Sequence, residues 1–283
     1  MNSLISSEHN VQRAFDRAAH RYYENCYEGQ NGSLQKQAAQ LLLPLLEGQI
    51  HSQGSNYLID RLVDLGCGMG VHWPALKAFA KHYTGIDLAP KMILEARKRQ
   101  QAAEKIGNSA TTSWLVGDAQ ALPLANTSAD IIFSNLAVQW CNNRKAVANE
   151  LYRVCKKGGN VYLSTLVSGS LKELYGLKKL GLLRAVNEYP EAANWQQQLE
   201  RAGFTAVVVK TNTVTTFHTT GSELLRSMKG IGASQVIAAQ KEATPQGLRT
   251  PKWLKAINTA FEPYQQEQGI PLTYQVALVQ ARK

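Results

Sequence analysis

The feature that most constrains the fold of this chain is a glycine-rich stretch, Leu62-Val63-Asp64-Leu65-Gly66-Cys67-Gly68-Met69-Gly70. Residues 57–64 form an apolar run that predicts a short buried strand, and residues 74–80 predict the first turns of a helix. The three glycines therefore lie in a strand-to-helix turn, where a missing Cβ allows positive φ and lets a ligand approach the backbone. A glycine motif must occupy this position if it is to bind a nucleotide.

The details of this stretch differ from those of a dinucleotide site. Val71 stands where the third glycine of G-x-G-x-x-G would fall, and Asp64 ends the strand, where a carboxylate would repel a pyrophosphate but suits an ammonium group. Asp87 follows at about the spacing of an acid that accepts hydrogen bonds from ribose hydroxyls. A ribose and an amino group without phosphates describe S-adenosylmethionine. The stretch resembles motif I of the class I methyltransferases, which implies that Asp87 is their ribose-binding acid.

Strand and helix patterns alternate after the glycines. Further strands are expected at residues 83–87, 114–116, 130–135 and 160–166. Helices are expected between them at 90–105 and 144–154, the second closed by the lysines and glycines of 156–159. Residues 204–217 and 272–279 alternate as two more strands, the last added antiparallel to the sheet edge. The sequence thus predicts an α/β fold, a doubly wound, seven-stranded, mostly parallel sheet with ligands at the carboxyl ends of its strands.

Other helical patterns lie outside this alternation, at residues 8–23, 34–46, 168–187, 191–202, 222–229 and 251–264. A helix that precedes the first strand cannot belong to the βαβ core, so we expect the first of these to pack on its rim above the strand ends. We expect one domain, 1–283, with a helical lid from 1–33, 168–187 and 218–268. Tyr22 or Tyr23 would close the site or reach the substrate, or would serve only in packing.

Two more polar residues end predicted strands. In the methyltransferase pattern Gly117-Asp118-Ala119 would contact adenine, with Asp118 accepting from the exocyclic amine, whereas an ordinary turn aspartate is the alternative. Asn135 opens Asn-Leu-Ala-Val, where nucleic-acid amine methyltransferases carry an Asn/Asp-Pro-Pro-Tyr/Phe box, so methylation of a base is disfavoured. The cofactor-binding residues implied by the resemblance are Asp64, Gly66, Gly68, Gly70, Asp87, Leu88, Met92, Asp118, Ala119, Asn135, Leu136 and Gln139.

The amino-acid composition limits the classes of partner that the protein is expected to bind. The net charge of +10 favours an acidic partner, but the basic residues are dispersed, so an acidic protein fits as well as RNA. The 4 cysteines and 6 histidines show no metal-ligand spacing, so we expect no metal and reduced thiols. No apolar run approaches the roughly 18 residues that span a bilayer, and the first residues do not resemble a signal peptide. We therefore expect a cytoplasmic protein without a membrane or nucleic-acid partner.

Five stretches together closely resemble the malonyl-acyl-carrier-protein O-methyltransferases of biotin synthesis. They are Phe15-Asp16-Arg17-Ala18-Ala19-x-x-Tyr22, Ser134-Asn135-Leu136-Ala137-Val138-Gln139-Trp140-Cys141, Ser164-Thr165-Leu166-x-x-Gly169-Ser170-Leu171-x-Glu173-Leu174, Leu225-Arg226-Ser227-Met228-Lys229-Gly230-Ile231-Gly232-Ala233 and Pro271-Leu272-Thr273-Tyr274. The resemblance runs from about residue 11 to the C-terminus. It departs at Ala185, where relatives often have histidine, so any substrate contact of that histidine is absent near Asn187.

The resemblance implies methyl transfer from S-adenosylmethionine, leaving S-adenosylhomocysteine, to the free carboxylate of malonyl-acyl-carrier protein. That carboxylate is ionised at neutral pH, so no general base is required. It does need a cation, for which Arg226 is the leading candidate and Lys229 the second, unless both belong to a solvated helix face. Acyl carrier proteins are acidic, and the expected docking face is Lys172, Lys178, Lys179 and Arg184.

Three other functions remain compatible with the sequence. The first is a small-molecule methyltransferase acting on a quinone precursor or another carboxylic acid, in which His20 or His218 would be the candidate base. The second is a non-catalytic cofactor-binding partner protein, which the intact Asp64, glycines, Asp87 and Asp118 disfavour. The third is an RNA methyltransferase, favoured by charge and disfavoured by the missing Pro-Pro box.

Overall fold

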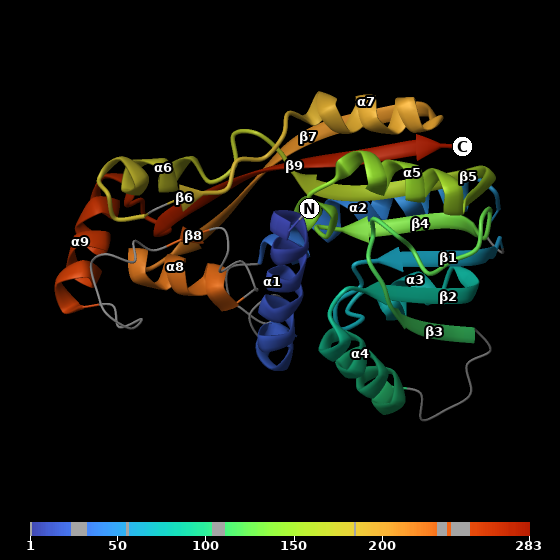
Figure 1. The fold of residues 1–283 in the computed structure, drawn as a ribbon, viewed down its shortest axis with the longest axis horizontal. Coiled ribbons are helices and arrows are strands. Elements are labelled where there is room, and N and C mark those ends of the chain that lie inside the picture. The colour runs from blue at the N-terminus through green and yellow to red at the C-terminus, as the bar shows by residue number, and fades with distance from the viewer. Residues whose placement is uncertain are drawn as a thin grey trace.

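The structure, a computed structural model, describes residues 2–23, 33–54, 57–103, 111–183, 185–230, 237–238 and 250–283. A seven-stranded sheet with the order β3-β2-β1-β4-β5-β9-β7 forms its centre (Figure 1). Its strands are β1 (Ile59–Leu65), β2 (Ala80–Asp87), β3 (Thr111–Val116), β4 (Ala129–Asn135), β5 (Cys155–Leu166), β7 (Thr205–His218) and β9 (Ile270–Arg282). Within this sheet only β9 runs against its neighbours. The predicted doubly wound, mostly parallel α/β fold is confirmed.

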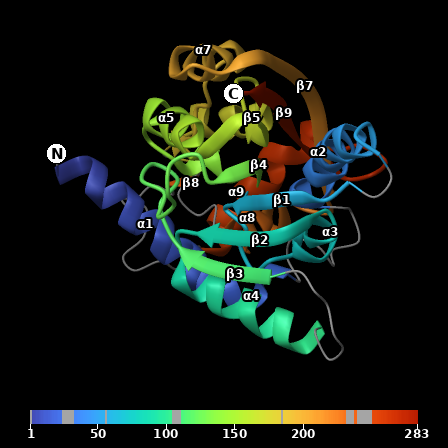
Figure 2. The same cartoon turned by 90° about the vertical axis from the view of Figure 1, so that its right-hand side faces the viewer.

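Helices cover both faces of the sheet, as Figure 2 shows for α2 and α5. The α-helices are α1 (Asn2–Ala18), α2 (Leu34–His51), α3 (Trp73–Lys77), α4 (Pro90–Ala103), α5 (Arg144–Val154), α6 (Lys172–Lys179), α7 (Ala192–Ala202), α8 (Gly221–Gly230) and α9 (Pro251–Phe261). Adjacent strand residues point to opposite faces, so Leu62 packs in the core beneath α2 and Val63 in the core beneath α5. Among the helices of the described residues, none is long and apolar enough to cross a membrane.

Beyond the parallel strands, α6, α8 and α9 gather at the far ends of β7 and β9 (Figure 1). Their buried leucines and aromatics, Leu174, Leu225 and Phe261 among them, continue the core that lies beneath α2. The buried Glu173 carboxylate joins α6 to β9 by accepting from the backbone N–H of Thr273 (3.1 Å) and from its hydroxyl (2.5 Å). The first helix, α1, lies beside the carboxyl ends of the parallel strands (Figure 1).

Three sequence-based predictions differ most from the structure. Strand β9 is not at the sheet edge: it lies between β5 and β7, so β7 forms the edge. Strand β5 begins at Cys155 rather than Asn160. Gly158 and Gly159, which were expected to end the preceding helix, pair instead with Lys283, the residue after β9. The Gly158 N–H donates to Lys283 O (2.7 Å), and the Lys283 N–H donates to Gly159 O (3.0 Å).

The helix predicted over 168–187 is the third error, because α6 covers only Lys172–Lys179. Gly181, in the left-handed region at φ +69°, ends it, and the N–H groups of Gly181 and Leu182 donate to the carbonyls of Lys178 and Leu177. The short strand β6 (Ala185–Val186) follows and pairs with β8 (Ile237–Ala238).

The turn after β1 approaches the turn after β4 closely. Gly66 has a φ of +71°, and a Cβ added there would lie 2.1 Å from the Cβ of Ala137. Gly66 is therefore required for two reasons, its backbone conformation and the contact with Ala137.

We expect Gly66→Ala to destabilise the protein by roughly 2–5 kcal/mol, combining the cost of positive φ with overpacking. Gly158→Ala is the matched control, because Gly158 has a similar φ of +81° but no atom of the described residues within 4 Å of an added Cβ. It should cost only about 1–2 kcal/mol. In denaturant unfolding, Ala137→Gly should recover part of the Gly66→Ala loss. Absence of coupling between positions 66 and 137 would contradict the contact.

Candidate active site

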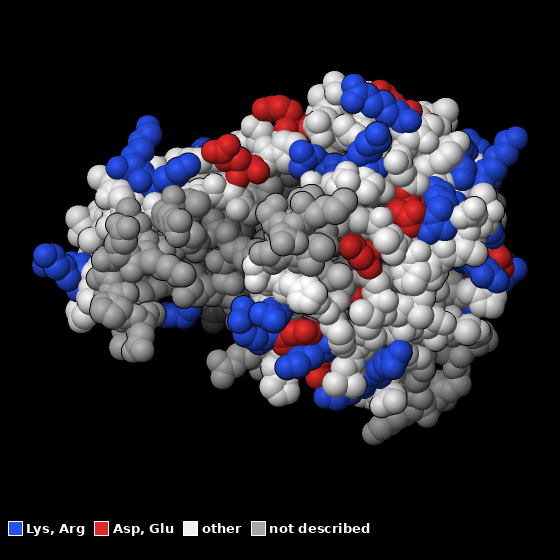
Figure 3. Space-filling model, viewed as in Figure 1, with Lys and Arg blue, Asp and Glu red and all other residues white. Residues whose placement is uncertain are grey.

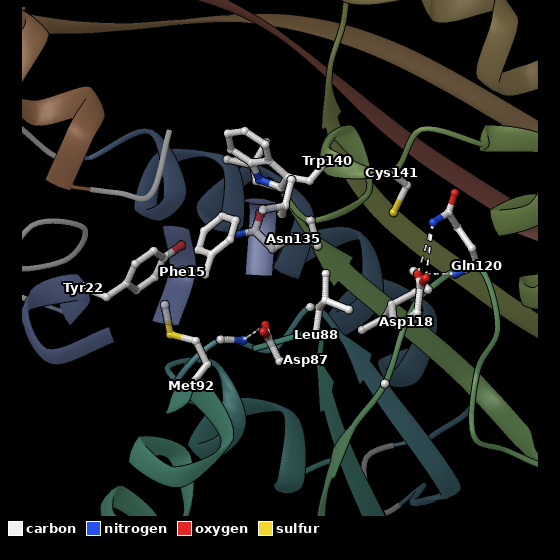
Figure 4. A pocket seen from close by; sticks show the side chains of 18 residues that line it. Phe15, Tyr22, Asp87, Leu88, Met92, Asp118, Gln120, Asn135, Trp140 and Cys141 are labelled. Atoms are coloured by element: carbon white, nitrogen blue, oxygen red, sulfur yellow. Dashed lines mark hydrogen bonds between the residues drawn. The ribbon is translucent and has the colours of Figure 1, made fainter. Parts of the chain in front are cut away.

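A cavity opens at the carboxyl ends of β1, β2 and β4, next to the point where the strand order reverses. Its empty volume, open mouth included, is about 770 Å³, a size suited to a small molecule. Figure 4 shows the aromatic rings of Phe15, Tyr22 and Trp140 on one side and Asp118 on the other, with Asp87 between these ends. Ligands of doubly wound folds bind in this position.

Asp87 is fixed by the glycine turn. Its Oδ2 accepts from the Gly68 N–H (2.9 Å) and its Oδ1 accepts from the Ala89 N–H (2.9 Å). Burial raises the pKa of this carboxyl to about 6, against which the two backbone hydrogen bonds act. A carboxylate oxygen has two lone pairs, so each oxygen of Asp87 can accept one more hydrogen bond from a ligand in the cavity.

The three glycines differ in what surrounds them. Gly66 and Gly68 line the cavity, and of the residues that the structure describes a Cβ added to Gly68 would contact the Tyr22 ring alone, at 3.8 Å. Gly70 is not part of the described cavity wall, and a Cβ there would lie 2.5 Å from the Trp114 ring. The missing side chain at Gly68 therefore leaves space for a ligand, whereas the missing side chain at Gly70 leaves space for the Trp114 ring in the core.

Asp64 lies behind the cavity. The side chain is 1% exposed, is absent from the described cavity wall, and accepts a hydrogen bond of 2.7 Å from the Tyr83 hydroxyl. Burial raises the pKa of the Asp64 carboxyl to about 7. The structure thus joins Asp64 to the core, and its contact with an ammonium group stays a prediction.

Asp118 has the contacts of a turn aspartate, and its contact with adenine stays a prediction. It lines the cavity, and its Oδ1 accepts from the backbone N–H of Gln120 (2.8 Å), as a turn aspartate does. Leu88, Met92 and Ala119 line the same cavity.

The Asn135 side chain lies in the cavity wall but is committed to a network that sequence reasoning missed. Its Nδ2 donates to Gln35 O (3.0 Å) and lies 3.3 Å from Nε2 of His72, while its Oδ1 accepts from the Ser164 hydroxyl (2.7 Å). Burial lowers the pKa of His72 to about 4, so the neutral ring can accept from Asn135. The Ser164 oxygen also accepts from the N–H of Leu136 (3.0 Å). A serine within an apolar strand was the available signal.

A second cavity, with an empty volume of about 410 Å³, adjoins the first. The two share Phe15, Tyr22, Leu136 and Trp140 as lining residues. Its other described lining residues are Leu34, Gln35, Gln139, Leu166, Leu171, Tyr189, Met228 and Tyr274. Gln139, predicted to bind the cofactor, therefore lines the second cavity, where its Nε2 donates to Leu136 O (2.7 Å).

The residues predicted to hold a substrate carboxylate are not brought together. Arg226 is exposed on α8 and lines neither described cavity, and the side chain of Lys229 lies outside the described residues. Tyr22 lines both cavities, whereas Tyr23 lines neither and packs under the Arg99 guanidinium, 3.9 Å from the ring centre.

Three of the four residues of the predicted docking face lie in the part of the chain that the structure describes. Lys172, Lys178 and Lys179 are exposed on α6, and Arg184 lies outside the described residues. Basic side chains are spread over the face of the molecule in Figure 3 rather than gathered in one patch.

The candidate bases are not in the cavities either. His20 is exposed and His218 contacts Thr216 (3.1 Å), and neither residue lines one of the two cavities. Where the structure describes the chain, no three His, Cys, Asp or Glu side chains group as metal ligands would.

Solved structures share this fold at low identity. The YcgJ protein from Bacillus subtilis is similar with a TM-score of 0.57 and 17% identity, over 83% of this chain and 97% of that one. A Haemonchus contortus phosphoethanolamine N-methyltransferase 2 in complex with S-adenosyl-L-methionine gives a TM-score of 0.57 and 16% identity, over 95% of this chain and 57% of that one.

Comparison with known sequences assigns the chain to a narrower family than the fold does. A family model described as a methyltransferase domain matches residues 63–163. The malonyl-[acyl-carrier protein] O-methyltransferase of Erwinia pyrifoliae is 36% identical over 80% of this chain and 77% of its own length. That of Serratia marcescens is 33% identical over 94% of this chain and 92% of its own length. The chain therefore belongs to the malonyl-[acyl-carrier protein] O-methyltransferase family of S-adenosylmethionine-dependent methyltransferases.

Proposed function

We infer that this protein methylates the free carboxylate of a malonyl group carried by acyl carrier protein or by coenzyme A, forming the malonyl methyl ester that enters biotin synthesis. The observation that carries this proposal is the agreement over most of the chain with relatives named for the reaction. Two adjoining cavities, one for a cofactor and one for an acceptor, are consistent with it.

The first cavity fits S-adenosylmethionine. Asp87 can accept from the ribose hydroxyls, Gly68 leaves the space that a Cβ would fill, and Asp118 can accept from the adenine amine. The cofactor would then run from Asp118 past Asp87 toward the aromatic end, which adjoins the second cavity. When bound, S-adenosylmethionine supplies a methyl group to the acceptor oxygen while the electron pair of the broken C–S bond stays on sulfur, so no proton moves.

The chain's own contribution is to orient the acceptor and exclude water. Phe15 packs edge-on against Trp140, with ring centres 5.4 Å apart, and against Tyr22, with centres 6.3 Å apart. These rings line both cavities. An acceptor carboxylate held there loses its hydration shell, which increases its reactivity as a nucleophile. Orientation of the two reacting groups can contribute several kcal/mol more.

The test of the function uses purified protein with radiolabelled S-adenosylmethionine and either malonyl- or acetyl-carrier protein. Base-labile label should appear on the malonyl form alone, because the acetyl group has no carboxylate. Label on neither form, with cofactor binding intact, would favour a small-molecule acceptor instead.

Cofactor binding should depend on pH through Asp87. Ribose hydroxyls donate to the ionised carboxylate, and its pKa in the free protein is about 6. Affinity for S-adenosylhomocysteine should therefore fall as the pH drops through about 6. Calorimetry at several pH values measures this. Asp87→Asn should lose about 10–100-fold in affinity and most of the pH dependence. Asp60→Asn, which alters an exposed carboxylate, should preserve both.

Arg226 is proposed as the cation that holds the acceptor carboxylate. We expect Arg226→Ala to raise KM for the malonyl substrate and to leave S-adenosylhomocysteine affinity unchanged. Arg201→Ala removes an exposed arginine on α7 and is the matched control. Equal malonyl kinetics in the two variants would remove Arg226 from the site.

Lys172, Lys178, Lys179 and Arg184 are proposed to dock the acidic carrier protein. Lys178→Ala with Lys179→Ala should lower kcat/KM for malonyl-carrier protein about 3–10-fold at low salt, and less at high salt, because the contact is electrostatic. The control pair Lys145→Ala and Lys157→Ala removes two exposed lysines elsewhere. If a short malonyl thioester showed the same salt profile as the carrier-bound substrate, docking at α6 would be excluded.

A further inference from the structure

Gln35 carries a buried amide without a partner. It is the second residue of α2, it is 8% exposed, and it lines the second cavity. Its Oε1 is shielded from solvent, and among the described residues neither Oε1 nor Nε2 has a hydrogen-bond partner. A buried polar group in this condition destabilises the folded protein and calls for an explanation.

The second cavity gathers such groups. The Oε1 atom of Gln139 also lacks a partner there, because its amide is held by the bond from Nε2 to Leu136 O. The hydroxyls of Tyr189 and Tyr274, by contrast, have the polar side chains of Asn187 and Thr216 beside them. Both unpartnered oxygens can only accept, so in this largely apolar cavity Nε2 of Gln35 is a group that remains able to donate to a ligand.

Gln35 lies where the two cavities meet. Its backbone carbonyl accepts from Nδ2 of Asn135 (3.0 Å), and Asn135 lines the first cavity. Leu136, the next residue, lines both cavities. A methyl-accepting oxygen must lie at this junction if the methyl donor occupies the first cavity, so the inference rests on the proposed function.

An anionic occupant suits this junction. None of the described residues lining the second cavity is basic, but Gln35 lies in the first turn of an 18-residue helix, where the helix dipole favours negative charge. A carboxylate loses its charge as it accepts a methyl group. A neutral N–H donor at the junction can therefore orient the carboxylate without strongly stabilising its charged starting state, whereas Arg226, which lines neither described cavity, would act on it from outside the junction.

We propose that the second cavity takes the carboxyl group of the methyl acceptor and that Nε2 of Gln35 donates a hydrogen bond to a carboxylate oxygen there. The side chain would thus bind substrate directly from the second cavity, whose lining residues Phe15, Tyr22 and Trp140 lie opposite to Asp118 in the first cavity (Figure 4).

The test uses Gln35→Leu, which keeps most of the side-chain volume and removes the amide. We expect kcat/KM for malonyl-carrier protein to fall about tenfold or more, because a hydrogen bond to a charged group is lost. Affinity for S-adenosylhomocysteine, measured by calorimetry, should not change. The denaturant midpoint should rise, because an unsatisfied buried amide has been removed. Gln35→Glu, of the same shape but with an ionisable oxygen in place of the N–H donor, should also lose malonyl turnover.

Thr165→Val is the matched control. The Thr165 hydroxyl is another buried group without a partner, but it lies in β5 and lines neither cavity, so the variant should gain stability with unchanged kinetics. If Gln35→Leu does not fold, Gln35→Asn serves for the kinetic comparison. Unchanged malonyl kinetics at position 35 in an otherwise active enzyme would overturn the assignment of Gln35 and leave the proposed function standing. A wild-type protein that methylates no malonyl thioester would overturn both.

Discussion

The hydrogen bond from the Gly68 N–H to the Asp87 carboxylate joins the turn after β1 to the end of β2. The rest of the site depends on it, because one acid both fixes the glycine turn and faces the cavity that the turn encloses. The turn can lie there because Gly66 allows the residues after β4 to approach to a distance that any side chain would prevent. Two strand ends and one carboxylate thus define the position of the cavity before any ligand is present.

The opposite side of the cavity is held by polar groups that bind each other. Asn135 connects β4 to α2 through Gln35 O and to β5 through Ser164, so its amide holds these three elements together at the site. Leu136 follows in the left-handed conformation, at φ +51°, and separates the two cavities. Strain of this kind in a non-glycine residue is maintained only where its surroundings determine it, as the two hydrogen bonds from the Leu136 N–H to Ser164 do here.

Sequence patterns predicted the sheet and brought together many residues that line the first cavity, because both depend on local order. Apolar strands, a glycine turn and acids at strand ends occur within short windows, so Gly66, Gly68, Asp87 and Asp118 were found together. The roles of Asp64 and Gly70 were harder to infer, since Tyr83 and Trp114, which contact them, belong to other strands. The second cavity was missed for the same reason: Gln35, Leu171, Met228 and Tyr274 are distant in sequence and meet only in the fold.

The place of β9 has a consequence for how the protein folds. This strand follows every other strand in the sequence but lies inside the sheet, so β7 has no partner in the described sheet until β9 is in place. Such long-range pairing is slow, because a large loop must close before the contacts that stabilise it can form. Tyr274 on β9 lines the second cavity, and Thr273 beside it holds Glu173 of α6. Completing the sheet and completing the second cavity are therefore one event, and a folding intermediate that lacks β9 would retain much of the first cavity without the second.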